Sequence, residues 1–400
     1  MKITLRNTLS PILKTVTIAS LFILSDAAAI CQERFSNVNI GFCYPISSNG
    51  AQAAEYTNHV SFNLLSGVSK EERSFSFAGI SNEVKDKVTG FQFAGILNRV
   101  KNTAEGFQFA GISNLTGGTV KGFQFAGIYN STANVEGFQF SGFLNRSKAI
   151  DGFQFAGFSN LLNGNADGFQ FAGFNNIVRG NVDGFQFAGF SNIVTANTKG
   201  FQFAGFINNT KDVEGTQFGG FINIAKKVRG LQFAGFINIA DSSDHSLALL
   251  NIIKKGEKNL AITTDEIQST LVTFRSGGRV LYGVLGLGFN LKTGRDYMVV
   301  EGGFGAHLPL SNSFRINGEA TGQYLEDWKS GYYYKTSLRL LPELKLGSRL
   351  AVLAGPSINF SETDTQVGMK LKNSDLWHEY SGNLKRQLFL GYTAGIQLSL

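Results

Sequence analysis

Residues 152–160 read Gly-Phe-Gln-Phe-Ala-Gly-Phe-Ser-Asn, and variants of this nine-residue phrase occur eleven times between Ser74 and Ala240. The copies begin at Ser74, Gly90, Gly106, Gly122, Gly137, Gly152, Gly168, Gly184, Gly200, Gly215 and Gly230, so the spacing is always 15 or 16 residues. A short fixed period is typical of a repeat array in which each unit forms one structural turn and stacks on its neighbours. Such an array indicates a scaffold or a surface rather than an active site.

Three columns of the repeat hardly vary: the second Phe, the inner Gly and the Asn. In the copies that start at Gly90, Gly106 and Gly122 they are Phe93, Gly95 and Asn98, then Phe109, Gly111 and Asn114, then Phe125, Gly127 and Asn130. Two glycines per repeat disfavour a helix, because each costs about 1 kcal/mol relative to Ala. The aromatic residues alternate at period two, which is typical of a strand.

The columns predict a β-solenoid. The alternation slips after the second Phe, because the next large apolar column, Ile or Phe, comes three residues later instead of two. A bend at Ala-Gly would allow the first Phe, the second Phe and this third column all to point inward. Coils stacked at the strand spacing of about 4.8 Å would make a rod of roughly 50 Å. We expect Phe to form the core and the Asn amides to form a hydrogen-bonded ladder at a corner. The functional alternative is a row of rings that binds sugar, but the array offers only Tyr129 where such platforms usually expose Trp or Tyr.

The C-terminal third predicts a different kind of β-structure. Long stretches alternate between an apolar and a polar face, as in 314–324, 332–340 and 350–360. Strands of about ten residues with this pattern suit a transmembrane barrel with a polar lumen, although a soluble sandwich also alternates. The chain end favours the barrel, because Thr393, Gly395, Leu398 and Leu400 resemble the terminal signal of bacterial outer-membrane barrels.

The first residues fit a secretory signal peptide over 1–29. Basic residues precede an apolar stretch from Thr15 to Leu24, and Ala27-Ala28-Ala29 supplies a cleavage site. Lipidation at Cys31 is a weaker alternative because Ile30 precedes it where a small residue is expected.

The alternation at 38–46 predicts a first barrel strand that pairs with the last strand, because an open sheet edge cannot sit in lipid. The predicted organisation is therefore a first barrel strand and loop over 30–58, a solenoid with degenerate ends over 59–258, and barrel strands over 259–400, about eight strands in all. The connection at 362–385 is long and those at 311–313 and 347–348 are short, which predicts the outer and periplasmic ends respectively. If 59–68 is a barrel strand, the array is periplasmic. If 59–73 is instead a degenerate first coil, because Phe62 is fifteen residues before Phe77, a strand within about 259–276 keeps the strand count even and the array emerges at the cell surface, which we favour.

Composition argues against an enzyme. The chain has 48 Gly, only 16% charged residues and a net charge of +7 from scattered basic residues, which gives little support to nucleic-acid binding. The four His lack partners at metal-ligand spacing, and the Phe-rich repeat is no phosphate loop, so no cofactor, metal site or catalytic residue is expected. Glu319 is better explained by a charge network with Arg315, Lys335 or Arg339 than as a catalytic acid.

The Gly-x-Gln-x-Ala-Gly-x-x-Asn array, together with Gly41-Phe42-Cys43-Tyr44-Pro45-Ile46 and the signal peptide, resembles the surface repeat-containing proteins of Gram-negative bacteria. The resemblance implies an outer-membrane or surface location, with outer-membrane lipid and the barrel-assembly machinery as partners and a surface ligand that it does not identify. Our first hypothesis is a barrel that anchors a scaffold for surface display, adhesion or envelope structure. The second is a channel or transport protein with the array as plug, as periplasmic arm, or as strands of a much larger barrel.

Overall fold

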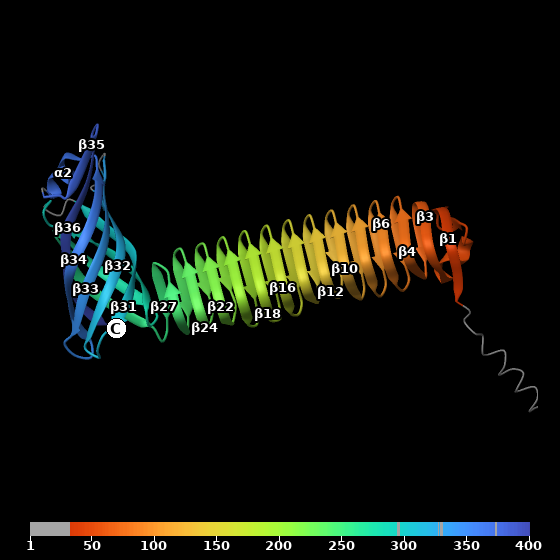
Figure 1. The fold of residues 1–400 in the computed structure, drawn as a ribbon, viewed down its shortest axis with the longest axis horizontal. Coiled ribbons are helices and arrows are strands. Elements are labelled where there is room, and N and C mark those ends of the chain that lie inside the picture. Colours follow the sequence, from red (N-terminus) through yellow and green to blue (C-terminus); the bar gives the residue numbers. More distant parts are fainter. Residues whose placement is uncertain (1–32, 294–296, 327, 329–330, 373) are drawn as a thin grey trace, which may run out of the picture.

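The protein consists of a long β-solenoid joined end-on to the side of a small β-barrel (Figure 1). The computed structural model describes residues 33–293, 297–326, 328, 331–372 and 374–400. The predicted signal peptide and Cys31 lie outside the described residues. Among the residues that the structure describes, no helix is long and apolar enough to cross a membrane.

Each full coil of the solenoid contains one long and one short strand. The long strands are β4 (Glu71–Ala78), β6 (Val88–Ala94), β8 (Ala104–Ala110), β10 (Thr119–Ala126), β12 (Asn134–Ser141), β14 (Ala149–Ala156), β16 (Ala166–Ala172), β18 (Val182–Ala188), β20 (Thr198–Ala204), β22 (Asp212–Gly219), β24 (Lys227–Ala234) and β26 (Ser242–Leu247). The short strands are β5 (Ser81–Val84), β7 (Leu97–Val100), β9 (Ser113–Thr116), β11 (Tyr129–Ser131), β13 (Leu144–Ser147), β15 (Ser159–Leu162), β17 (Asn175–Val178), β19 (Ser191–Val194), β21 (Ile207–Asn209), β23 (Ile222–Ile224), β25 (Ile237–Ala240) and β27 (Leu250–Ile253). Long strands pair in parallel with long strands and short with short. The pairing is in repeat register, as in Gly122↔Gly137, except for a register shift between β24 and β26. This parallel pairing excludes the larger barrel in which every repeat is one membrane strand.

The Phe columns lie outside the solenoid, so the predicted Phe core is wrong. Three columns of each long strand point inward: the Gln, the Ala after the second Phe, and the small or apolar residue two positions before the opening Gly. Both Phe columns point outward. The Ile or Phe column at the corner is also outside, with 37–50% of each side chain exposed in all eleven copies. The rings still stack from coil to coil, as between Phe138 and Phe153, whose centroids are 4.8 Å apart.

Two amide ladders fill the interior instead of Phe. Gln side chains from Gln92 to Gln232 donate to one another along the rod at 2.7–3.0 Å. Asn side chains from Asn82 to Asn251 do the same at 2.9–3.1 Å. Most of the Asn amides also donate to the carbonyl of the second Phe in the next coil, as Asn98 does to Phe109 at 2.8 Å. The predicted Asn ladder is confirmed, and because each amide finds its partner in the neighbouring coil, burial of these polar groups costs little.

Glycine is required at both repeat positions, for different reasons. The opening glycines from Gly90 to Gly230 have φ between +97° and +136°, a conformation that disfavours any side chain. The inner glycines have ordinary φ but lie against the preceding coil. A Cβ at Gly157 would meet the carbonyl oxygen of Gly142 at 2.1 Å.

The first strands belong to the solenoid, which corrects the predicted barrel strand at 38–46. β1 (Arg34–Cys43) pairs in parallel with β3 (Tyr56–Ser69), and β3 pairs in parallel with β4 and β5. Between them lie β2 (Ile46–Ser47) and the 3₁₀ helix η1 (Gly50–Glu55). The prediction that 59–73 forms a degenerate first coil is confirmed, because Phe62 is in register with Phe77.

The barrel follows the solenoid and closes on itself. Its eight strands are β28 (Glu257–Asp265), β29 (Ser269–Gly277), β30 (Leu281–Asn290), β31 (Met298–Pro309), β32 (Phe314–Glu326), β33 (Tyr333–Lys345), β34 (Leu350–Thr363) and β36 (Leu384–Ser399). They are antiparallel, and β28 closes the barrel by pairing with β36, so the last strand finds its partner after the array rather than before it. The connection from β34 to β36 carries α2 (Gln366–Leu371) and β35 (Trp377–Ser381), which confirms it as a long loop.

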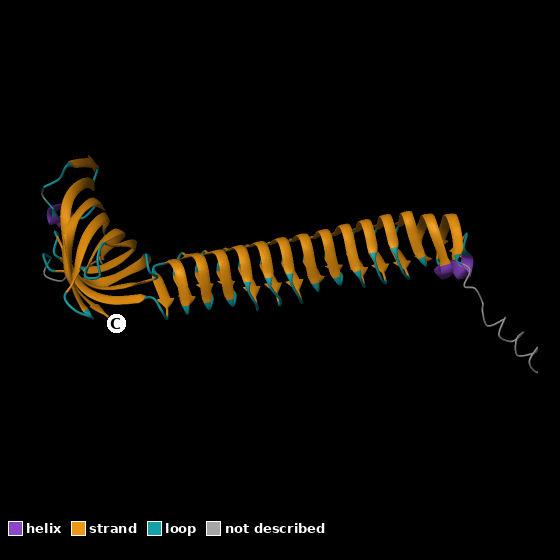
Figure 2. Ribbon diagram, turned by 60° about the horizontal axis from the view of Figure 1, so that its bottom comes forward, coloured by secondary structure: helices purple, strands orange, loops and turns teal. Residues whose placement is uncertain are grey.

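The two barrel ends differ. The long-loop end carries α2 and β35, while the short-turn end carries the connections at 278–280, 310–313 and 346–349 and the chain terminus. Glu257, which follows directly from the solenoid, also lies at the short-turn end, because it pairs with Gly277. The rod therefore meets the barrel near its short-turn end and runs across the direction of the barrel strands (Figures 1 and 2).

Candidate functional site

The barrel wall is apolar outside and polar inside. On β36, Leu390, Tyr392, Ile396 and Leu398 are 44–58% exposed, whereas Gln387, Thr393 and Gln397 are buried in the lumen. The same split holds on β32, where Arg315, Asn317, Glu319, Thr321 and Gln323 face inward, as the alternation predicts. Of the proposed terminal signal, Thr393 faces the lumen, Gly395 lies between Thr263 and Leu353 of the neighbouring strands, and Leu398 and Leu400 are on the outside.

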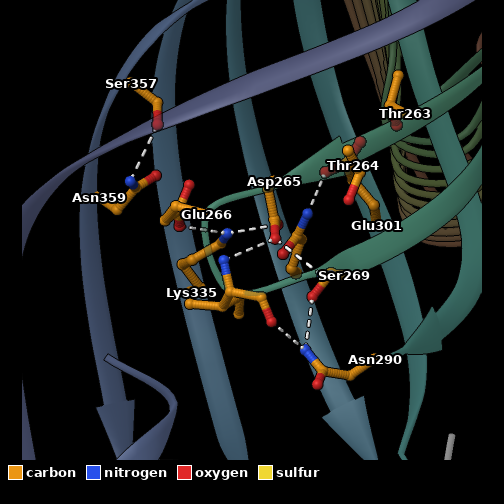
Figure 3. Close-up of polar contacts among 12 residues, drawn as sticks. Thr263, Thr264, Asp265, Glu266, Ser269, Asn290, Glu301, Lys335, Ser357 and Asn359 are labelled. Atoms are coloured by element: carbon orange, nitrogen blue, oxygen red, sulfur yellow. Dashed lines mark hydrogen bonds and ion pairs between the residues drawn. The ribbon is translucent and has the colours of Figure 1, made fainter. Parts of the chain in front are cut away.

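Ion pairs close the lumen toward the long-loop end. Figure 3 shows Lys335 reaching from β33 to Asp265 and Glu266 at the β28–β29 turn, with Nζ–O distances of 2.7 and 3.0 Å. Asp265 also accepts hydrogen bonds from the backbone amides of Ile267 and Ser269, which holds the turn over the lumen. On the long-loop side of these ion pairs lies an apolar cluster that includes Ile267, Tyr333 and Leu371 of α2.

Further ion pairs fill the middle and the short-turn end of the lumen. Glu319 accepts from Arg275 at 2.7 Å and from the Tyr282 hydroxyl at 2.9 Å, and Arg339 pairs with Glu301 at 2.5 Å. Arg315 bridges Glu257 and Glu343 at 2.7 and 3.0 Å. The expected network around Glu319 exists, but its main partner is Arg275, which the sequence alternation did not single out. Each of the carboxylates named here therefore forms an ion pair with an arginine inside the barrel.

The solenoid docks on the outer wall of the barrel through its last coil. The final ladder residue, Asn251, donates from its side-chain amide to the Ser276 carbonyl at 2.9 Å and from its backbone amide to the Ser276 hydroxyl. Its neighbours Ala248 and Leu249 lie on Gly283 of β30, where a Cβ would meet their carbonyl oxygens at 2.0 and 2.3 Å. The Asn ladder thus continues directly into the barrel wall.

Gly283→Ala is expected to separate the last coil from the barrel, because the new methyl group collides with two backbone oxygens that have no room to move. Hydrogen exchange of the β27 amides should accelerate while exchange in β32 and β33 is unchanged. The matched control is Gly302→Ala on the adjacent strand, whose Cβ would only touch a Leu249 methyl carbon at 3.5 Å. Equal exchange in the two variants would show that Gly283 does not hold the junction.

One carboxyl is buried in the solenoid interior. Burial raises the pKa of Glu72 to about 7, while hydrogen bonds from Asn58 and Ser61 lower it by less. A carboxyl whose pKa is raised in the folded state binds its proton more tightly there than in the unfolded chain. The contribution of protonated Glu72 to stability is therefore fully present below its unfolded pKa of 4.5 and is lost as the pH rises to about 7.

The N-terminal coils should accordingly be less stable at pH 8 than at pH 4.5, by up to about 3 kcal/mol, since a pKa difference of one between the folded and unfolded states corresponds to about 1.36 kcal/mol. Glu72→Gln is expected to remove this dependence, whereas Glu71→Gln, on the neighbouring half-buried carboxyl, should keep it. Hydrogen exchange of residues 57–78, corrected for the intrinsic effect of pH, measures the difference. A pH dependence that survives in Glu72→Gln would assign it to another group.

The described part of the chain holds no group of three or more His, Cys, Asp or Glu placed to bind a metal ion. Comparison with known proteins finds no match: no family model, no curated protein and no solved structure is similar to this chain.

The aromatic exterior is the feature that the sequence interpretation missed. The signal was present in the polar or charged residue before each opening Gly, such as Glu105 and Lys121. This residue is two positions before the first Phe, so both side chains point to the outer face of the strand. A charged neighbour on the same face indicates the outside of the coil.

Proposed function

We propose that this chain is a non-enzymatic outer-membrane protein whose barrel anchors the solenoid as a structural scaffold on the periplasmic side of the membrane. The observation that carries the proposal is the closed eight-stranded barrel with an apolar wall and an ion-paired interior. A soluble barrel buries apolar residues and exposes polar ones, whereas an outer-membrane barrel presents an apolar band to lipid. Outer-membrane lipid and the barrel-assembly machinery are the partners that this role requires.

The position of the array supports the periplasmic side rather than the cell surface. The surface expectation depended on a barrel strand before the array, and β1 belongs to the solenoid instead. The array enters the barrel at the end that carries the short turns and the chain terminus. In outer-membrane barrels short turns are periplasmic and long loops are outside.

The lumen favours an anchor over a channel. Eight-stranded barrels are just wide enough to be filled by side chains. Here Arg275, Lys335 and Arg339 are each at most 4% exposed and are paired with carboxylates inside the barrel. The transport hypothesis has no comparable observation in its favour.

Site-directed labelling of intact cells tests the proposal. In a background in which Cys31 and Cys43 are replaced by Ser, a single cysteine is introduced either at Asn383, in the exposed β35–β36 turn, or at Lys148, on the exposed rod surface. A membrane-impermeant maleimide should label Asn383→Cys in intact cells and Lys148→Cys only after the outer membrane is permeabilised. Labelling of Lys148→Cys in intact cells would place the array outside and overturn the periplasmic scaffold.

A further inference from the structure

Between residues 74 and 240 the charges of the solenoid are confined to one side of each coil. In all eleven copies the nine residues from the opening position to the Asn contain no Asp, Glu, Lys or Arg. Every charged residue between 74 and 240 lies in the six or seven residues that follow the Asn. We call the second segment the charged edge, and we call the corner column Ile80, Ile96, Ile112, Ile128, Phe143, Phe158, Phe174, Phe190, Phe206, Phe221 and Phe236 the apolar edge.

The apolar edge is exposed over the whole rod. Its eleven side chains are 37–50% exposed, and in the first coil Phe62, which aligns with the second Phe column, is 48% exposed. Beside it, the second Phe of six successive coils, from Phe125 to Phe203, lines a shallow groove of about 690 Å³ together with the small residues that follow the first five. Soluble monomers rarely expose a continuous apolar surface of this extent, so it requires an apolar environment.

The junction with the barrel orients the two edges. Ala248 and Leu249, which occupy the corner position of the last coil, lie against Gly283 and Gly302 on the outer barrel wall. Lys254 and Lys255, on the opposite side of that coil, lead into Glu257 at the short-turn rim. The apolar edge therefore faces along the barrel wall toward the long-loop end. The charged edge is level with the short-turn end of the barrel.

The outer wall of the barrel is also apolar close to its short-turn end. The outward residues Leu308, Leu344 and Leu350, close to the short turns, are 43–59% exposed, so the apolar belt reaches the rim. The turns of successive coils line up along the rod (Figures 1 and 2), and the pairing in repeat register keeps each residue column at the same turn, so the orientation set at the junction extends along the rod. A bilayer that surrounds the barrel therefore meets the apolar edge of the rod at the same depth.

We infer that the solenoid lies in the plane of the membrane, with its apolar edge embedded in the acyl chains of the leaflet next to the short turns and its charged edge in water. This inference rests on the proposed barrel anchor and names lipid as the occupant of the aromatic surface. The segregation of charge from exposed Phe and Ile matches what an interfacial amphipathic element requires. The groove along the second Phe column offers an apolar track for acyl chains, and because the amide ladders satisfy the interior, the lipid meets side chains rather than unpaired backbone.

Depth-dependent fluorescence quenching of the full-length protein in lipid vesicles tests this. An environment-sensitive probe is attached at Phe174→Cys on the apolar edge or at Lys211→Cys on the charged edge, with Cys31 and Cys43 replaced by Ser. Acyl-chain spin labels should quench the Phe174 probe and iodide should not, and the Lys211 probe should show the reverse. Iodide quenching of both probes would overturn the inference. Protection of the Phe174 probe from both quenchers would also overturn it and would assign the surface to a second copy of the chain.

A charge variant provides the second measurement. The triple substitution Phe158→Asp, Phe174→Asp and Phe190→Asp should abolish acyl-chain quenching of a probe at Ile112→Cys. The control places the same charge in the same three coils, but on the charged edge, and should leave that quenching unchanged. It carries Asn165→Asp, Asn181→Asp and Asn197→Asp. Because vesicles have no cell surface or periplasm, a failure here contradicts lipid embedding alone, while labelling of Lys148→Cys in intact cells contradicts only the periplasmic assignment.

Discussion

Asn208→Leu is expected to break the solenoid open between β20 and β24. The Asn208 amide donates to the Phe218 carbonyl at 2.7 Å and to Asn223 at 2.9 Å, and it accepts from Asn192 at 2.9 Å. Leucine has a similar size but leaves the Phe218 carbonyl and the Asn223 oxygen without these partners inside a coil stack that excludes water. Each orphaned buried group costs roughly 1–3 kcal/mol, so the expected local loss from these two groups is about 2–6 kcal/mol.

The matched control is the next residue. Asn209 is exposed on the outer face of the same short strand, and Asn209→Leu should change stability little. Hydrogen exchange of β20 to β24 in the two full-length variants gives the comparison. If Asn208→Leu exchanges as slowly as Asn209→Leu, the ladder is not what holds neighbouring coils together. Coils far from the site should stay protected in both variants, because each coil contacts mainly its neighbours.

Glu319→Gln is expected to destabilise the barrel by about 3–5 kcal/mol, because it leaves buried Arg275 without its compensating charge. Glu319 is completely buried and pairs with Arg275 at 2.7 Å, and its only other nearby cation among the described residues, Arg339 at 3.7 Å, is paired mainly with Glu301. The temperature at which the folded barrel loses its characteristic mobility in detergent electrophoresis should fall.

Two controls separate this effect from a general loss of charge. Glu379→Gln removes an exposed carboxylate on β35, 3.9 Å from Arg386, and should leave the unfolding temperature unchanged. The double variant Arg275→Met with Glu319→Leu removes both charges and should be more stable than Glu319→Gln alone, because an apolar pair replaces an uncompensated ion. If the double variant is the less stable of the two, the ion pair itself contributes net stability.

The periodicity of the chain was sufficient to predict its architecture. The 15–16-residue period identifies stacked coils, the Asn column identifies the ladder, and the alternation at 314–324 assigns the inner and outer faces of the barrel wall correctly. The short turns and the long 362–385 connection also follow from composition and length. These features are local, since each depends on residues within one strand or one repeat.

Two assignments of particular segments required the tertiary structure. The pattern Phe-Gln-Phe-Ala defines two faces but does not say which is inside, and an average preference for buried Phe selected the wrong one. The Gln ladder decides the matter: Gln92 is stacked inside the coil on Gln108 and Ala94 is buried beside it, so Phe91 and Phe93, which alternate with them, point outward. The alternation at 38–46 likewise suits a barrel strand and a first coil equally, and only its parallel pairing with β3 distinguishes them.

The sequence by itself therefore determined the period, the ladder and the two faces of each strand, because these follow from the alternation and stacking of neighbouring residues. Which face is buried, which strand closes the barrel and how the rod meets the wall depend on contacts between distant segments, such as Asn251 with Ser276 and Ala248 with Gly283. The same contacts set the apolar edge of the rod at the level of the apolar belt of the barrel, because the backbone of the last coil can approach the wall closely only where glycine leaves room.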